Sequence, residues 1–294
     1  MIPFVDVQQT LVRADGAQIA YWQHRALESR GVLLFIHGLA SNHTRFSEFV
    51  KHSELTCSWD TLRVDLRGHA ASVHRGVINM NVWCADLCAV LDACGYSRVV
   101  LVGHSLGANV TAHFAHRYPA RVAGLILIDP VQSRAMLGTL ARIALATALT
   151  VAAPAVRWLN AIGLHRRVLS MLDLEQLDQH ARTLLAQGRD AEMEQLYSSS
   201  WESLKYFPTA TYLQAVSLAL QSLSTPAPLV PALMLLSVHA RDAAVELNRA
   251  YAARLPQCDV VEIPCNHWIL TAAPDAARVA IETWVTRLGA SVHQ

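Results

Sequence analysis

The 294-residue sequence has little charge of either sign and lacks the signatures of several protein classes. Only 16% of the residues are charged and the formal net charge is +1, so no overall basic excess prepares the chain for nucleic acid or an anionic membrane. We therefore expect no nucleic-acid partner. The sequence also has no H-E-x-x-H motif, P-loop or dinucleotide fingerprint, so it implies no metal and no cofactor.

Cysteine is sparse, and the N-terminal residues carry no targeting pattern. The six cysteines are Cys57, Cys84, Cys88, Cys94, Cys258 and Cys265. Their spacing matches neither a compact disulfide framework nor paired zinc ligands. Residues 1–7 contain neither a basic region nor an apolar core, so we expect no signal peptide. These absences predict a reduced, cytoplasmic protein.

Short apolar runs typical of buried strands recur along the chain, and segments with helical periodicity separate them. The expected strands are residues 32–36, 61–66, 99–102, 123–128, 231–236 and 259–263. The expected helices are residues 44–51, 81–93, 108–118, 243–254 and 275–288. Strands that alternate with helices predict an α/β protein with a mostly parallel, doubly wound sheet. Before them, alternating segments on both sides of Asp15-Gly16 predict a hairpin.

Residues 131–225 interrupt the alternation, because they carry helical patterns and no convincing strand. We predict a core domain of residues 1–130 and 226–294, with a helical cap of residues 131–225 inserted after the sixth strand. Such a cap would lie over the C-terminal edge of the sheet, where α/β proteins place their ligand sites.

One segment of the predicted cap, residues 143–156, is uncharged and lies between Arg142 and Arg157. It is too short to span a bilayer, which takes about 20 apolar residues. We favour a helix that packs on the core. The alternative is an apolar lid that makes transient contact with lipid surfaces. If the segment also lines a substrate pocket, it predicts a substrate with an apolar acyl group.

The motif with the clearest chemistry is Gly103-His-Ser-Leu-Gly107, which follows an apolar strand and precedes a helix-like segment. Strand, tight turn and helix form the context of a G-x-S-x-G nucleophile elbow. There Ser105 adopts a strained backbone conformation, and the two glycines remove Cβ atoms that would clash. The backbone N–H of Leu106 would then face a developing oxyanion. The alternative is a tight turn with an incidental serine.

The whole pattern resembles the α/β-hydrolase fold family, in its serine esterase and lipase-like branch, over nearly the full chain. The matching pieces are His37-Gly38 after the third strand, Asp65-Leu-Arg-Gly-His69 after the fourth, the elbow, and Asn266-His267 after the last strand. The resemblance implies an α/β-hydrolase fold with a serine, an acid and a histidine in that chain order. It also implies that the backbone N–H of Leu39 is the second oxyanion donor.

Ser105 needs a general base, and the candidate is His267, which follows the last strand. Two aspartates satisfy the chain order for the acid. Asp242 lies in the loop that usually carries it, although this loop is two residues longer than the usual Gly-x-x-Asp. Asp129 ends the sixth strand, and its neighbour Pro130 also suits a structural carboxylate. We prefer Asp242 and keep Asp129 as the alternative.

These residues predict a serine hydrolase that cleaves a small lipophilic carboxylic ester through an acyl-enzyme. Serine at the elbow argues against haloalkane dehalogenases and epoxide hydrolases, which resemble this fold but use aspartate there. Thioesterase, amidase, carbon–carbon bond hydrolase and acyltransferase chemistries stay open, because the fold does not choose between them. A non-catalytic binding or accessory protein on the same fold is the alternative from another class.

Overall fold

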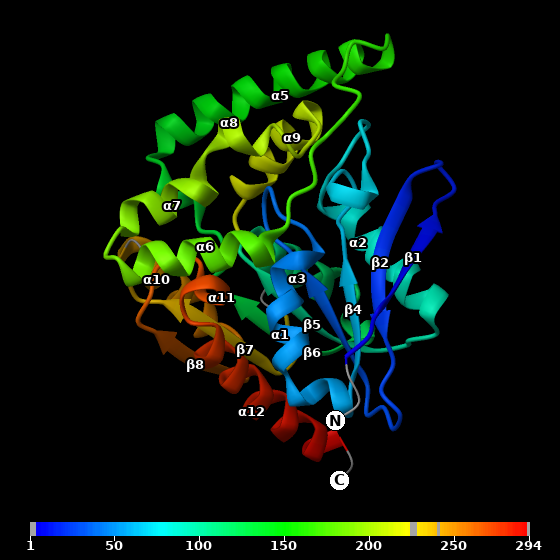
Figure 1. Ribbon diagram of the computed structural model, residues 1–294, viewed down its shortest axis with the longest axis vertical. Coiled ribbons are helices and arrows are strands. Elements are labelled where there is room, and N and C mark those ends of the chain that lie inside the picture. The colour runs from blue at the N-terminus through cyan, green and yellow to red at the C-terminus, as the bar shows by residue number, and fades with distance from the viewer. Residues whose placement is uncertain (1–3, 224–227, 240–241, 293–294) are drawn as a thin grey trace.

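An eight-stranded sheet forms the centre of the computed structural model, which describes residues 4–223, 228–239 and 242–292 (Figure 1). The strands are β1 (Val7–Val12), β2 (Gln18–His24), β3 (Val32–Ile36), β4 (Asp60–Val64), β5 (Val99–His104), β6 (Val122–Ile128), β7 (Ala232–Ser237) and β8 (Cys258–Ile263). Their spatial order is β1-β2-β4-β3-β5-β6-β7-β8. Only the pairs β1–β2 and β2–β4 are antiparallel. The predicted mostly parallel sheet and the hairpin are therefore confirmed.

Helices cover both faces of the sheet, so its central strands are buried on both sides. In β3, Leu33 and Phe35 pack toward α1 (Ser47–His52) and α12 (Pro274–Val292). Leu34 and Ile36 pack on the other face, toward α2 (Met80–Cys94), α3 (Leu106–Arg117) and α10 (Asp242–Ala252). Side chains alternate between the two faces of a strand, so a continuous apolar run is what a doubly covered strand requires. Short 3₁₀ helices are η1 (His43–Phe46), η2 (Glu54–Cys57), η3 (Ala70–Ser72) and η4 (Pro119–Arg121).

Six helices occupy the segment between β6 and β7 in the described part of the chain. They are α4 (Ser133–Met136), α5 (Thr139–Ala161), α6 (Leu174–Ala186), α7 (Asp190–Ser198), α8 (Ser200–Ser203) and α9 (Thr209–Ala219). The short helix α11 (Ile269–Ala272) follows β8 and packs against α6. This agrees with the helical character expected for the segment, whereas the division of the chain into two domains stays a prediction.

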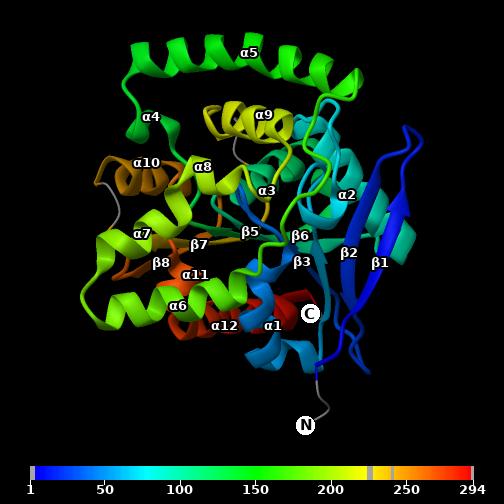
Figure 2. The ribbon, with the colours of Figure 1, turned by 45° about the horizontal axis from the view of Figure 1, so that its top comes forward.

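The helix α5 contains the apolar segment 143–156 and lies at the outside of the molecule. Figures 1 and 2 show it above α9, against which it packs. Of its 23 residues, the buried ones are Leu149 and Ala153. Within the described residues it is the one helix long and apolar enough to cross a membrane by length and composition. The expectation of a helix packed on the core is therefore wrong.

Candidate active site

The elbow holds Ser105 at the carboxyl end of β5, in the conformation that the motif predicts. Its backbone has φ 57° and ψ −122°, and α3 begins at the next residue. A Cβ added to Gly103 would lie 2.4 Å from the carbonyl oxygen of Gly107. A Cβ on Gly107 would lie 2.1 Å from the carbonyl oxygen of Ile36. Only glycine allows these close approaches, so the expected role of both glycines is confirmed.

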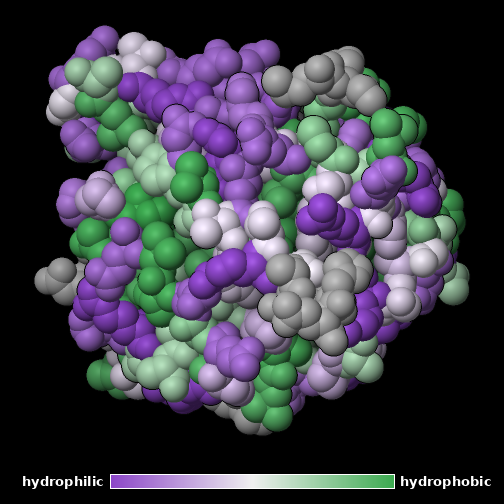
Figure 3. Space-filling view, turned by 90° about the horizontal axis from the view of Figure 1, so that it is seen from below, coloured by the Kyte–Doolittle hydropathy of each residue, from purple (hydrophilic) through white to green (hydrophobic). Residues whose placement is uncertain are grey.

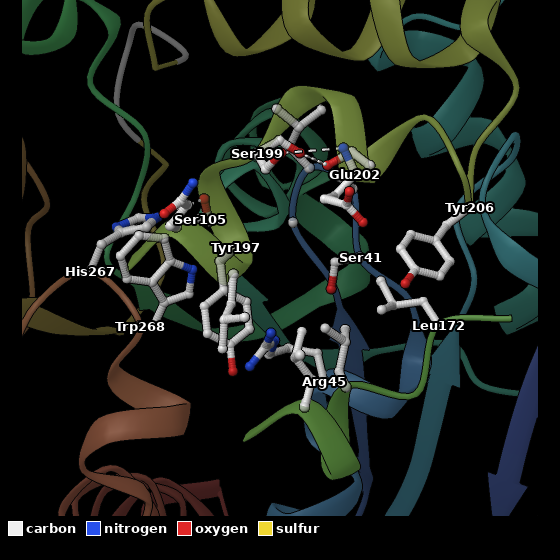
Figure 4. Close-up of a pocket in the computed structure, with 18 of the residues that line it drawn as sticks. Ser41, Arg45, Ser105, Leu172, Tyr197, Ser199, Glu202, Tyr206, His267 and Trp268 are labelled. Atoms are coloured by element: carbon white, nitrogen blue, oxygen red, sulfur yellow. Dashed lines mark hydrogen bonds between the residues drawn. The ribbon is translucent and has the colours of Figure 1, made fainter. Parts of the chain in front are cut away.

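A chain of hydrogen bonds joins Ser105 to an aspartate through His267. The Nε2 atom of His267 lies 3.0 Å from the Oγ of Ser105, and its Nδ1 lies 2.5 Å from Oδ2 of Asp129. The hydroxyl of Ser237 also donates to Oδ2 of Asp129, at 2.7 Å. A carboxylate accepts, so Nδ1 carries the proton and Nε2 accepts from the serine hydroxyl. The side chains of Ser105 and His267 lie next to each other in Figure 4.

The carboxylate that contacts His267 is not the one that the sequence analysis preferred. Asp129, the alternative, makes this contact and is 5% exposed. Asp242 is the first residue of α10, and its side chain lies outside the described residues. Among the described side chains, Asp129 is the acid candidate that contacts His267, and the choice between the two aspartates stays a prediction.

The parallel sheet brings Asp129 to this position. The backbone N–H of Ser105 donates to the carbonyl of Ile128 at 2.9 Å, and the backbone N–H of Asp129 donates to that of Leu235 at 2.9 Å. These bonds extend the β5–β6–β7 ladder past the strand ends, where Asp129 adopts φ 46°. Ser237 ends β7, and its hydroxyl and backbone N–H both donate hydrogen bonds to the Asp129 carboxylate. Ser237 is not among the residues predicted from the sequence, where its only signal is a hydroxyl at the end of the next strand.

His37 holds the loop that carries Leu39 in a defined position. Its Nε2 accepts a hydrogen bond from the N–H of Leu66 at 3.0 Å, and its Nδ1 donates to the carbonyl of Gly38 at 2.9 Å. The ring is fully buried, and burial lowers the pKa of His37 to about 4. A neutral imidazole with one donor and one acceptor satisfies both contacts. Within the described residues, no backbone or side-chain acceptor binds the N–H of Leu39 or of Leu106.

A cavity of about 620 Å³ opens beside Ser105. One wall consists of the loop from Gly38 to Ser41 with His267 and Trp268, and α6, α7 and α8 form the other. The leucines in its lining are Leu39, Leu172, Leu174, Leu177, Leu184 and Leu196. No residue of 143–156 is among the described lining residues, so the prediction that this segment lines the pocket is wrong. No group of three or more described His, Cys, Asp or Glu side chains is placed to hold a metal ion.

The charged residues of the lining on α7 and α8 are paired with neighbours in sequence. Arg189 forms an ion pair with Glu192, and Glu202 forms one with Lys205. All four side chains are roughly half exposed. These charges therefore belong to the solvent-facing rim of the cavity and are neutralised there.

A buried ion pair ties the cavity wall to the core. Nη1 of Arg45 in η1 lies 2.8 Å from Oδ1 of Asp178 in α6, and both side chains are less than 5% exposed. Asp178 also accepts hydrogen bonds from Tyr197 at 2.6 Å and from Thr271 at 3.0 Å. The guanidinium lies over the ring of Tyr197, as Figure 4 shows. This cluster could not be predicted from the sequence, because its members are up to 226 positions apart.

Comparison with known families agrees with this geometry. The family model for the alpha/beta hydrolase fold matches residues 31–274. The chain therefore belongs to the α/β-hydrolase family. Among solved structures, a hydrolase from Pseudomonas aeruginosa has a TM-score of 0.68 at 21% identity and covers 95% of this chain and 98% of its own. An E-2-(acetamidomethylene)succinate hydrolase has a TM-score of 0.64 at 18% identity, with 96% and 100% covered. At these identities the similarity is one of fold.

Curated relatives match a shorter part of the chain. A Haemophilus influenzae protein with an esterase/lipase name is 33% identical over 98 residues, which are 33% of each chain. The 2-(acetamidomethylene)succinate hydrolase of Mesorhizobium japonicum is 31% identical over 99 residues, covering 33% of this chain and 35% of its own. The matches thus span about a third of these relatives.

Proposed function

We propose that this α/β hydrolase cleaves a carboxylic ester through a Ser105–His267–Asp129 triad. The observation that carries the proposal is the hydrogen-bonded chain of these three side chains, which begins at the wall of the cavity. A serine hydroxyl is a weak nucleophile and needs a base within hydrogen-bond reach. Nε2 of His267 lies 3.0 Å from the Ser105 hydroxyl, and its Nδ1–H group donates a hydrogen bond to Asp129.

In the first half of the reaction, Ser105 Oγ attacks the ester carbonyl carbon while His267 Nε2 takes the hydroxyl proton. The tetrahedral oxyanion accepts hydrogen bonds from the backbone N–H groups of Leu39 and Leu106. Collapse of this intermediate breaks the bond to the alcohol oxygen, which leaves with the proton from His267. The Asp129 carboxylate stabilises the imidazolium that exists between these two transfers.

In the second half, water attacks the acyl-enzyme and gives a proton to the same histidine. The proton then returns to Ser105 Oγ as the carboxylic acid departs, and the enzyme is restored.

The leucines of the cavity support an apolar acyl or alcohol part in the substrate. Six leucines are among the residues that line the cavity, while the charged residues of α7 and α8 in the lining are paired and roughly half exposed. Each buried methylene contributes about 0.8 kcal/mol, so each added carbon should raise kcat/KM about fourfold until the cavity is full. A ladder of p-nitrophenyl esters from acetate to octanoate measures this slope.

Reaction with a fluorophosphonate tests the nucleophile, because only an activated serine is modified. Intact mass should show one adduct, and peptide mapping should place it on Ser105. We expect Ser105→Ala to abolish labelling and to lower kcat by a factor on the order of 10⁴ or more. Ser203→Ala is the matched control, since Ser203 also lines the cavity. Labelling that persists in Ser105→Ala would overturn the assignment.

The same experiment addresses the other activities that this fold supports. An enzyme that labels at Ser105 but cleaves no ester would act instead on a thioester, an amide or a carbon–carbon bond, or transfer the acyl group. A chain that neither labels nor turns over any of these substrates would be a binding or accessory protein. Cytoplasmic location stays a prediction.

A further inference from the structure

The surface formed by residues 139–171, here called the α5 surface, exposes large apolar side chains along its whole length. Six of them are more than 60% exposed: Leu140, Val151, Trp158, Leu164, Val168 and Met171. Figures 1 and 2 show α5 as the outermost layer, with α9 on its inner side. The opposite face of the molecule, shown in Figure 3, mixes hydrophilic and hydrophobic residues. Single exposed apolar residues are common, but a continuous group marks an interaction surface.

The charge of this surface indicates that its partner is anionic. Residues 139–171 contain no aspartate or glutamate, while they contain Arg142, Arg157, Arg166 and Arg167. Arg166 and Arg167 are exposed, whereas Nε of Arg142 is buried and Nη1 of Arg157 lies 3.5 Å from Oε1 of Gln214 on α9. The net charge of +1 for the whole chain conceals this local excess of four positive charges. The exposed Arg166 and Arg167, next to an apolar helix face, would attract anionic lipid headgroups, and Trp158 suits the boundary between headgroups and acyl chains. A symmetric contact with a second copy would instead bring two arginine-rich surfaces together.

The length of the uncharged segment favours a helix that lies on a membrane over one that crosses it. Residues 143–156 are bounded by Arg142 and Arg157. At about 1.5 Å per residue they extend over about 21 Å, which is less than the roughly 30 Å of a bilayer's hydrocarbon core. One side of the helix is also occupied, since Leu149 and Ala153 are buried where α5 packs on α9.

We propose that the α5 surface docks on a membrane that contains anionic lipids, with the axis of α5 in the plane of the membrane. The end of this surface adjoins the cavity: the N–H of Ser170 donates to the carbonyl of Lys205 at 3.1 Å, and Leu172 and Tyr206 line the cavity. Lipid binding itself does not depend on the proposed ester hydrolysis.

Co-flotation with lipid vesicles tests the proposal. The purified protein is mixed with phosphatidylcholine vesicles that contain 30% or no phosphatidylglycerol, and the bound fraction gives a partition coefficient. The apolar variant combines Val151→Ser, Trp158→Ser and Met171→Ser. Its matched control combines Val5→Ser, Val12→Ser and Leu27→Ser, which are equally exposed near the β1 edge. Circular dichroism and thermal unfolding show whether each variant keeps its fold.

We expect the wild type to bind the anionic vesicles more tightly than the neutral ones, and less tightly as salt is added. The apolar variant should lose on the order of a hundredfold in partition, and the control variant less than twofold. Removing one charge with Arg167→Gln should cost about fivefold on anionic vesicles, whereas Arg30→Gln on another face should cost nothing.

Three results would overturn the proposal. The first is a wild type that does not float with anionic vesicles, and the second is an apolar variant that binds as well as its control. The third is a concentration-dependent dimer, seen by analytical ultracentrifugation without lipid, that the apolar variant abolishes. That result would assign the α5 surface to contact between copies of the chain. Because no substrate is involved, failure of docking is distinguishable from failure of the proposed hydrolysis.

Discussion

Replacement of Asp129 by asparagine tests the assignment of the acid most directly, because it exchanges one carboxylate oxygen for an NH₂ group and preserves the side-chain shape. In the structure the carboxylate accepts hydrogen bonds from Nδ1–H of His267 at 2.5 Å and from the hydroxyl of Ser237 at 2.7 Å. An amide NH₂ placed toward His267 would require Nδ1 to accept, so the ring proton would move to Nε2. That nitrogen could then no longer take the proton of Ser105.

The size of the effect follows from the charge that is lost. When His267 becomes an imidazolium, its attraction to a carboxylate at about 4 Å and an effective dielectric constant near 20 is about 4 kcal/mol. Loss of this stabilisation alone lowers kcat roughly a thousandfold, and the wrong tautomer brings the expected decrease to about 10⁴. The melting temperature should change little, because the asparagine fits the same space and can still bind Ser237.

The assay compares kcat for p-nitrophenyl butyrate and the rate of fluorophosphonate labelling in Asp129→Asn and Asp242→Asn. We expect the first variant to lose both activities by a similar factor and the second to stay within about twofold of wild type. The reverse order would return the acid to Asp242 and refute the role of Asp129. Small effects in both variants would show that neither carboxylate orients His267.

Two further predictions concern stability. Asp178→Ala should lower the free energy of unfolding in urea by about 3–5 kcal/mol, because it leaves the Arg45 guanidinium buried without its partner. The double variant Arg45→Met with Asp178→Leu should recover most of this loss. An equal loss in the double variant would contradict this explanation. Burial lowers the pKa of His37 to about 4, so between pH 6.5 and pH 4 the unfolded chain binds more protons than the folded protein. The free energy of unfolding should therefore fall by up to about 3 kcal/mol as the pH is lowered from 6.5 to 4. His37→Gln should reduce this pH dependence in urea titrations, and an unchanged slope would exclude His37 as its source.

The strands, the helices and the elbow could be predicted from the sequence because local patterns specify them. A continuous apolar run such as 32–36 suits only a strand or helix that is covered on both sides, and its length favours a strand. The Gly103–Gly107 motif, between an apolar strand and a helical segment, indicates a tight turn, and in the structure the close backbone approaches there leave no room for a Cβ. Ser105 and His267 followed from that motif and from chain order, and the structure brings them within 3.0 Å.

The acid, the cavity wall and the position of α5 depended on tertiary structure. Chain order admits both Asp129 and Asp242, and only the β5–β6–β7 register determines that Asp129 reaches His267. The pairing of Arg45 with Asp178 joins residues 133 positions apart, which no local pattern reports. Residues 143–156 have the composition of a core helix and of a surface helix alike. How exposed these residues are depends on how much of α5 the neighbouring helices cover. Only the packing of the folded protein determines this coverage.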